Sequence, residues 1–380
     1  MIRYAAQKIS KEDIKEVRIA LKNNFITQGK QVDYFEKKIS QVVDSKYCLS
    51  LNSASSALLL ACKAIGLKKN DIGWTTTNTF AATANAILLC DAKVDFVDID
   101  IDTFNISVVA LEKKLKNTKK NQLPKVLIIV HFGGSPCELK KIFKLSKKYK
   151  FRVIEDASHA LGASYEDNKI GNCKYSDITI FSFHAIKIIT TCEGGAITTN
   201  NPSIYNKIKL MRTNGISREV MNLNQNHQKW YYEQKSIGYN FRLNEIQAAL
   251  GRSQIKKIKL WIRKRNQISK MYKRNLKELP IKFQKVEKNS TSSYHLFTIL
   301  IKTKDIRNKL YNYLLNKKIE TNVIYIPLYR HPFYKNKFNY KKFQNSELYF
   351  QECLSLPMHL NLTKKEIKYI IKSISHFFNE

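Results

Sequence analysis

Apolar residues recur every three or four positions near the start of the chain. Ser10 and Asp13 stand three residues apart, which is the spacing of a capping box at a helix N-terminus. Ile14, Val17 and Leu21 follow and share one face of the helix that this pattern predicts. The chain is therefore expected to open with a capped, amphipathic helix.

A second helical period, at residues 32–42, leads into a regular alternation of apolar strands and amphipathic helices. The pattern predicts, in order, strand YCLSL, helix SSALLLACKAIGL, helix ATANAILLC, strand KVDFVDI, strand KVLIIVHF, helix ELKKIFKLSKKY, strand FRVIED, strand DITIFSF and strand GGAITT. Such alternation favours an α/β domain with a mostly parallel sheet, in which ligands bind beyond the C-terminal ends of the strands.

The pattern changes after the stretch GYNFRLNEIQAALG. A long basic helical stretch covers residues 251–278, and strand YHLFTILI, helix DIRNKLYNYLLNKK and strand NVIYI follow it. Thr363 and Glu366 form a second capping box before a closing helix. We therefore predict a large domain at residues 1–252, which includes the N-terminal helical segment, and a smaller α+β domain at residues 253–380.

The composition is that of a globular protein, with 380 residues, 43% hydrophobic and 26% charged. No apolar stretch approaches the roughly 20 residues that cross a bilayer, and the start lacks the apolar middle of a signal peptide. The seven cysteines are scattered, without zinc-type spacing. We expect no membrane insertion, no metal site, and a cytoplasmic location with reduced thiols.

The formal net charge of +35 raises the possibility of a nucleic-acid partner, because phosphate backbones favour clustered Lys and Arg. The excess is mostly lysine, however, and it is spread over the polar faces of nearly every predicted helix. We interpret the charge as a solvated surface that favours anionic ligands in general, and we expect no nucleic-acid partner.

Two stretches at strand ends could bind parts of one cofactor. In LNSASSAL, the backbone N–H groups of Ala54 and Ser55 could hold a phosphate at a helix N-terminus, although small residues there also serve as plain caps. In VIEDASHALGA, Asp156 could pair with a protonated pyridine nitrogen, and His159 could bond or stack against the ring. Taken alone, Asp156 could equally cap the next helix.

The stretch FSFHAIKIITTCEGGA supplies a hydroxyl, Ser182, and a lysine, Lys187, in the turn after a strand. A lysine in a cationic, desolvated pocket has a lowered pKa, so its free amine can attack an aldehyde. A solvated charge is the alternative in so basic a chain. In GYNFRLNEIQAALG, Asn240 and Arg242 precede a helix and would by themselves indicate only a cap and a surface charge.

Together these stretches resemble the DegT/DnrJ/EryC1/StrS family of pyridoxal-phosphate (PLP) sugar aminotransferases. Further blocks that carry the resemblance are ITQGKQVDYFEKKIS, NTFAATANAILLCDAKVDFVDIDIDTFNI, VHFGGSPCEL, IPLYRHPFY and LSLPMHLNLT, so it covers nearly the whole chain. The resemblance implies the PLP-dependent transferase fold type I. Within the family, the motifs around Lys187 and Asn240 are most similar to those of the aminotransferases of pseudaminic acid biosynthesis.

The resemblance also implies roles for individual residues. Lys187 would be the Schiff-base lysine and Asp156 the partner of the pyridinium nitrogen. His159 would lie beside the ring, and Phe80 would stack on its face. Ala54, Ser55 and Ser182 would bind the phosphate. The resemblance also implies a homodimer with a shared active site, in which Asn240 would reach the phosphate from the other subunit.

The implied reaction moves an amino group from L-glutamate to C4 of a nucleotide-linked 4-keto-deoxysugar, such as a UDP-linked 4-keto-6-deoxy-HexNAc, for bacterial surface glycans. A PLP-dependent sugar dehydratase and an aminotransferase of the perosamine type are the alternatives, and a nucleic-acid-binding protein is a more distant one. Lys187 argues against the dehydratase interpretation, since the family members that are dehydratases carry a histidine at the position of this lysine.

Three positions depart from the family pattern. Thr77 replaces a proline, and Asn214 and Ile324 each replace a histidine. We expect the first two to adjust loops near the cofactor and the third to lie near the sugar. The sequence assigns no role to His184.

Overall fold

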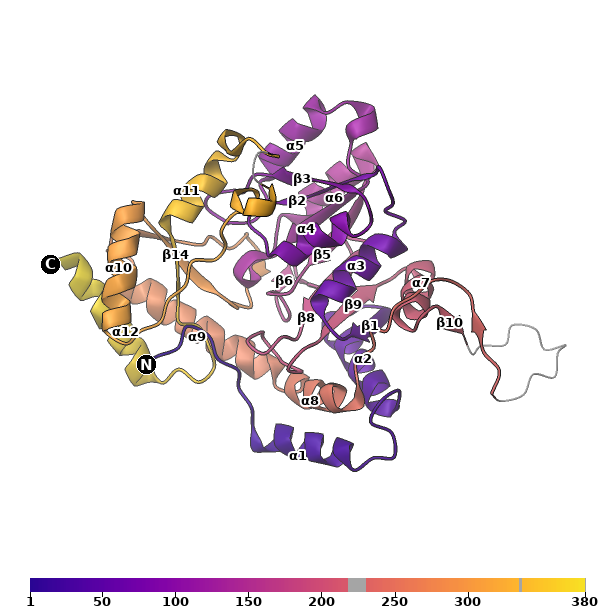
Figure 1. Ribbon diagram of the computed structural model, residues 1–380. Coiled ribbons are helices and arrows are strands. Elements are labelled where there is room, and N and C mark those ends of the chain that lie inside the picture. The colour runs from indigo at the N-terminus through magenta and orange to yellow at the C-terminus, as the bar shows by residue number, and fades with distance from the viewer. Residues whose placement is uncertain (218–229, 335–336, 380) are drawn as a thin grey trace.

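The computed structural model describes residues 1–217, 230–334 and 337–379 (Figure 1). Helix α1 (Lys11–Leu21) begins with the predicted capping box, in which Ser10 Oγ accepts from Asp13 N and Asp13 accepts from Ser10 N. The helix turns Asp13 and Ala20 toward the protein, whereas Ile14 and Leu21 of its apolar face are 61% and 56% exposed. The predicted helix is confirmed, and these two apolar side chains remain exposed to solvent in the single chain.

A seven-stranded sheet forms the centre of the molecule, in the order β1-β9-β8-β5-β4-β2-β3. Its strands are β1 (Tyr47–Leu51), β2 (Ile72–Thr76), β3 (Lys93–Val97), β4 (Val126–Val130), β5 (Arg152–Asp156), β8 (Ile178–Ser182) and β9 (Gly195–Thr199). The neighbours from β8 to β3 are parallel, and β9 runs antiparallel to both β8 and β1. The predicted, mostly parallel sheet is confirmed, and β2 is a strand that the sequence pattern did not indicate.

Helices cover both faces of this sheet, as buried parallel strands require. In β4 the apolar side chains alternate: Ile128 packs in the core with helices α3, α4 and α7, while Leu127 and Ile129 pack in the core on the other face. The covering helices are α2 (Lys30–Val43), α3 (Ala54–Ala64), α4 (Ala81–Leu88), α5 (Val108–Asn117), α6 (Leu139–Tyr149), α7 (Pro202–Arg212) and α8 (Glu245–Ile255).

A smaller antiparallel sheet follows in the C-terminal part, with the order β12-β14-β15. Its elements are β12 (Ile281–Phe283), β14 (Phe297–Ile301), β15 (Cys353–Leu356), α10 (Lys304–Asn316), α11 (Gln344–Glu352) and α12 (Lys364–Asn379), the last preceded by the predicted Thr363–Glu366 capping box. Two small sheets of short strands are also present. One has the order β13-β6-β7, with β13 (Ser290–Thr291), β6 (Ser164–Tyr165) and β7 (Asn168–Lys169), and the other pairs β10 (Ile216–Ser217) with β11 (Glu233–Gln234).

The strand predicted at residues 322–326 is not formed. Only Asn322 makes a single bridge, to Ser355. The backbone of this segment bonds side chains instead, since Tyr349 Oη donates to Ile324 O at 2.5 Å and Tyr325 N donates to Asn78 Oδ1 at 3.4 Å. Two of the residues that suggest a strand, Ile324 and Tyr325, line a cavity here.

Helix α9 (Ile258–Leu276) runs from one part of the molecule into the other (Figure 1). Its first turns bury Ile258 and Trp261 in the core of the large sheet, and its later turns bury Ile268 and Tyr272 in the core of the small sheet. The domain boundary after residue 252 stays a prediction, and the long basic stretch consists of two helices, α8 and α9, rather than one.

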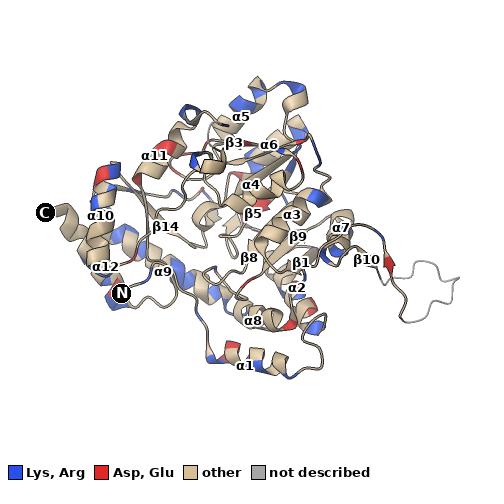
Figure 2. Ribbon diagram, in the orientation of Figure 1, with Lys and Arg blue, Asp and Glu red and all other residues tan. Residues whose placement is uncertain are grey.

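The positive charge lies on many elements. Figure 2 shows Lys and Arg on most of the outer helices, with acidic residues interspersed. Within the described ranges, no helix combines the length and apolarity needed to cross a membrane. The same residues contain no group of three or more histidine, cysteine or acidic side chains that could hold a metal ion.

Candidate active site

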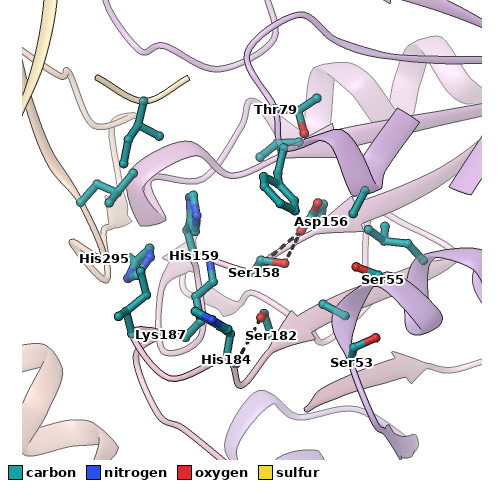
Figure 3. A pocket seen from close by; sticks show the side chains of 18 of the residues that line it. Ser53, Ser55, Thr79, Asp156, Ser158, His159, Ser182, His184, Lys187 and His295 are labelled. Atoms are coloured by element: carbon teal, nitrogen blue, oxygen red, sulfur yellow. Dashed lines mark hydrogen bonds between the residues drawn. The ribbon is translucent and has the colours of Figure 1, made fainter. Parts of the chain in front are cut away.

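A cavity of about 350 Å³ opens where three parallel strands end. Val130, Asp156 and Ser182, the last residues of β4, β5 and β8, lie in its wall, which is the edge of an α/β sheet where ligands usually bind. Seven of the eight residues proposed from the sequence line this one cavity: Ala54, Ser55, Phe80, Asp156, His159, Ser182 and Lys187 (Figure 3).

Asp156 is buried at the end of β5 and is held by three hydrogen bonds. Its Oδ1 accepts from Ser158 N at 3.1 Å and Ser158 Oγ at 2.6 Å, and its Oδ2 accepts from Thr83 Oγ1 at 2.9 Å. Thr83 in turn accepts from Thr79 Oγ1 at 2.8 Å. These bonds fix the direction of the carboxyl group, which suits a partner for a protonated ring nitrogen.

Lys187 lies in the connection between β8 and β9, where its backbone N donates to His184 O at 2.9 Å. Among the described residues its amine has no hydrogen-bond partner. Burial lowers the pKa of Lys187 to about 8, although the charge of Asp156 acts in the opposite direction. A substantial fraction of this amine is therefore uncharged near neutral pH, unlike that of a surface lysine.

The N-terminus of α3 forms the opposite end of the cavity. Ser53 is the N-cap and accepts from Ser56 N at 3.1 Å, so Ala54 and Ser55 supply the first free N–H groups of the helix. A Cβ on Gly195 would come within 2.6 Å of Ala54 N, so glycine is required for this helix to lie against the start of β9. With the Ser182 side chain in the same wall, the arrangement can bind a phosphate.

His159 is buried beside Lys187. Its Nε2 lies 3.3 Å from Tyr325 Oη, its ring centroid lies 4.5 Å from that of His295, and its Nδ1 has no partner among the described residues. Burial, and then the charge of Lys187, hold the pKa of His159 well below its usual range. The ring is therefore neutral, with a nitrogen available for a bound group.

Phe80 and Asn240 occupy different places. Phe80 is the N-cap of α4 and is 60% exposed at the cavity, with its ring 6.2 Å from that of Tyr325. Asn240 is exposed and forms an isolated bridge with Thr213, outside the residues that line the cavity of its own chain. Its predicted role, in the site of a second subunit, stays a prediction.

The departures from the family pattern lie as follows. Ile324 is buried in the cavity wall. Thr77 follows β2 and shares a hydrogen bond with Ser346 at the start of α11. Asn214 has a left-handed backbone, with φ 60°, and its N donates to Tyr239 O at 2.9 Å. His184 lies half-exposed at the cavity, with Nε2 3.8 Å from Glu193 Oε1.

Sequence reasoning missed four residues of this site: Thr83, Ser158, His295 and Tyr325. Ser158 carried a local signal, since a serine two residues after a strand-end aspartate commonly bonds its carboxylate. Thr83 lies one turn of helix after Thr79, but nothing in the sequence connects it to Asp156. His295 and Tyr325 come from the C-terminal part, and their arrival at the cavity depends on tertiary packing.

The combination of a strand-end carboxylate, a desolvated lysine and a helix N-terminus is that of a PLP enzyme. The chain belongs to the DegT/DnrJ/EryC1/StrS aminotransferase family, whose model matches residues 7–375. Aminotransferases of this family use PLP, so the predicted cofactor and fold type I are confirmed.

Individual relatives are similar over nearly the whole chain. The UDP-4-amino-4,6-dideoxy-N-acetyl-beta-L-altrosamine transaminase of Campylobacter jejuni (strain 81-176) is 38% identical over 373 residues, which cover 97% of this chain and 96% of that protein. The GDP-perosamine synthase of Escherichia coli O157:H7 is 30% identical over 354 residues, covering 93% and 92%.

Among solved structures, Helicobacter pylori PseC, an aminotransferase involved in the biosynthesis of pseudoaminic acid, superposes with a TM-score of 0.91. It is 34% identical in sequence, and the match covers 100% of this chain and 99% of that one.

Proposed function

We propose that this protein transfers an amino group from L-glutamate to C4 of a nucleotide-linked 4-keto-deoxysugar. The observation that carries the proposal is the desolvated amine of Lys187, with a lowered pKa and no hydrogen-bond partner among the described residues, in a cavity that also holds the fixed carboxylate of Asp156. When bound, PLP supplies an aldehyde carbon for the amino group and a ring that accepts electrons.

The residues present fit this cofactor. Lys187 would hold it covalently, and Asp156 would keep a proton on its ring nitrogen. The N–H groups of Ala54 and Ser55, with the Ser182 hydroxyl, would bind its phosphate. The unpartnered Nδ1 of His159 is a buried polar atom that a bound polar group would satisfy.

Lys187 also fits the role of the proton carrier. A general base works best when its pKa lies near the working pH, and the pKa of Lys187 is lowered to about 8. Its amine would take the proton from Cα of glutamate and, in the second half of the reaction, return a proton to C4 of the sugar. Neutral His159 and the phenol of Tyr325 do not compete for this proton, because burial lowers the pKa of the histidine and raises that of the tyrosine.

The proposed acceptor is a UDP-linked 4-keto-6-deoxy-HexNAc, by similarity to the relative from C. jejuni, which would place the reaction in pseudaminic acid biosynthesis. Leu296 and Ile324, from the C-terminal part of the chain, form an apolar wall of the cavity. Such a wall suits a deoxy carbon, which presents a methyl group where other sugars present a hydroxyl. The basic surface would assist capture of the diphosphate. We propose a cytoplasmic location and no nucleic-acid partner.

We further propose that the protein acts as a homodimer whose active sites are shared. Phe25 and Ile26, in the loop after α1, are 71% and 50% exposed, and Ile14 and Leu21 of α1 are exposed as well. Ile26 O accepts from Glu245 N at 3.0 Å, so this apolar surface adjoins the start of α8, five residues after Asn240. A second copy that covered this surface would therefore lie near Asn240.

The lysine is tested with a Lys187→Ala variant and a 4-keto UDP-sugar. We expect the variant to consume no glutamate and to form no amino sugar, because it lacks the amine that both half-reactions use. The exposed Lys69, changed to alanine, is the matched control and should retain full activity. An active Lys187→Ala protein would contradict the proposal, and formation of a deoxysugar without consumption of glutamate would indicate a dehydratase.

The shared site is tested by mixing two inactive variants, Lys187→Ala and Asn240→Ala, after reversible dissociation. Half of the dimers formed are mixed, and each mixed dimer has one site with both residues intact, so about one quarter of the wild-type activity should return. If Asn240 serves the cavity of its own chain, mixing restores nothing. Light scattering on the unmixed proteins gives the oligomeric state.

A further inference from the structure

His159 is held from the C-terminal part of the chain at two points. Ser293 Oγ donates to His159 O at 2.6 Å, and the His295 ring lies 4.5 Å from the His159 ring at an interplanar angle of 41°. Ser293 and His295 are themselves buried. The backbone and the ring of His159 are thus both in contact with one short segment, residues 292–295.

This segment is in turn fixed by α9. Arg265 is 2% exposed, and its Nη1 donates to Tyr294 O at 3.1 Å, His295 O at 3.3 Å and Met358 O at 3.1 Å. The next residue, Asn266, donates from Nδ2 to Ser292 O at 3.1 Å. Three of the four carbonyls of the segment therefore bond to side chains of one helix.

Arg265 has an unusual setting for a charged residue. Burial is the only cause that shifts its pKa, which it lowers to about 10, and no carboxylate among the described residues acts on it. Burying a guanidinium without an anion is unfavourable unless its N–H groups are bonded. The three carbonyl bonds of Nη1 offset part of that cost here, while Nε has no partner among the described residues. The position of the segment and the position of the charge therefore depend on each other.

The other side of the segment lies against the turn after β4. Ser293 N donates to Gly134 O at 3.1 Å, and Leu296 N donates to Gly133 O at 3.3 Å. Gly134 has φ +95°, and a Cβ there would come within 2.1 Å of Ser293 Oγ and 2.8 Å of His159 O. Glycine is thus what lets the segment approach His159 so closely.

We propose that residues 292–295, anchored by Arg265, form a clamp that sets the position of the His159 imidazole, with His295 as the positioning residue that contacts the ring. The inference deepens the proposed function, because it rests on His159 lying beside the bound cofactor. In Figure 3, His159 is drawn between His295 and Asp156, so the clamp acts from the side away from the carboxylate.

The clamp has a measurable electrostatic consequence. His295 excludes water from one side of the His159 ring, and burial is the largest cause of the low pKa of His159. The titratable groups that face His159 are Lys187, His295 and Tyr325; the last two are neutral, and the charge of Lys187 also lowers the pKa. Opening the clamp to water should raise the pKa of His159 toward the ordinary value of 6.5.

The test compares His295→Phe, which keeps an aromatic ring against His159, with His295→Ala, which removes it. The holoprotein is labelled at histidine Cε1, and the eight histidine signals are followed by NMR as the pH is varied, with the His159 signal assigned by a His159→Gln variant. We expect His159 to remain neutral through the ordinary histidine range in the wild type and in His295→Phe, and to titrate in His295→Ala.

Two further measurements keep the result interpretable. His131 is fully buried, and its Nε2 lies 2.7 Å from Glu155 Oε2. Its ring makes no hydrogen bond or ring contact with residues 292–295, so its signal should be present in every variant if the fold is intact. Ser293→Ala removes only the side-chain bond to His159 O and should shift the His159 signal in the same direction as His295→Ala. This variant replaces His295→Ala in the test if His295→Ala does not fold.

Identical His159 titrations in all four proteins, or equal titration in His295→Phe and His295→Ala, would overturn the proposal. The readout is a proton on His159 and requires no turnover. A negative aminotransferase assay would therefore not change the His159 titration result. A negative titration result would likewise not contradict the aminotransferase activity.

Discussion

Replacing Lys187 with methionine should make the cofactor-free protein more stable. The pKa of this lysine falls from 10.5 to about 8 in the folded chain, a shift of about 2.5 units, because its amine is desolvated. At 1.36 kcal/mol per unit, keeping the charged amine in the cavity costs about 3 kcal/mol of folding free energy. Methionine has a similar length and no charge, so it removes that cost.

The sign and the pH window of this effect are fixed by the two pKa values. The folded state binds the proton more weakly than the unfolded state, so the destabilisation is complete below about pH 8 and disappears above 10.5. The gain from Lys187→Met should therefore be about 3 kcal/mol at pH 7 and smaller by about 2 kcal/mol at pH 9.5.

Urea unfolding of the cofactor-free proteins at these two pH values measures the difference, with Lys69→Met as the matched control at an exposed lysine. The control should change stability by less than about 0.5 kcal/mol at either pH. A Lys187→Met protein that is no more stable than the wild type at pH 7, or whose gain is the same at both pH values, would refute the assignment of a desolvated amine.

Three other changes have defined outcomes. Asp156→Asn should lower the rate of the glutamate half-reaction by about 100-fold or more in stopped-flow measurements, because the ring nitrogen loses its anionic partner; an unchanged rate would contradict the role. Gly195→Ala should weaken PLP binding about tenfold in a fluorescence titration, since the new Cβ would come within 2.6 Å of Ala54 N. An unaltered affinity would contradict phosphate binding at the N-terminus of α3. Asp13→Ala should cost about 3 kcal/mol at pH 7 by leaving Lys257 unpaired. Despite burial, bonds from Ser253 and others lower the pKa of Asp13 below 3.8, so calorimetry should find this cost intact above about pH 4 and shrinking as the pH falls from there toward the lower pKa of the folded state.

The regular parts of the fold follow from local patterns. The strands that end at Asp156 and Ser182 were predicted to within two residues, because buried parallel strands are short apolar runs with polar residues at their C-terminal ends. The two capping boxes were predicted correctly for a similar reason, since a cap depends on residues only three positions apart.

The failures share a different cause. Ile324 and Tyr325 have the alternation and side-chain types of a strand, yet the segment lines the cavity, and its backbone groups bond Asn78 and Tyr349 instead of a neighbouring strand. The periodicity of α1 gives an apolar face but not what it packs against, and Ile14 and Leu21 of that face are exposed in the single chain. His295 reaches the site through Arg265, a contact between residues 30 positions apart that no local pattern contains.

The site residues that could be proposed from the sequence are those next to strand ends. Asp156, Ser182 and Lys187 belong to strands or their first connecting turn, so the order of the sheet brings them together once it is assembled. Asn240 was proposed by resemblance alone, and the single chain leaves it outside the cavity.

The reversed strand β9 affects how the cofactor would be taken up. It pairs directly with β8, from Ser182 opposite Gly195 onward, so the connection that carries Lys187 is tied at both ends to the central sheet. The loop-closure entropy of this connection is therefore lost when the sheet folds, before any ligand arrives. PLP capture by the folded chain should accordingly show no slow step of loop ordering between association and attachment to Lys187.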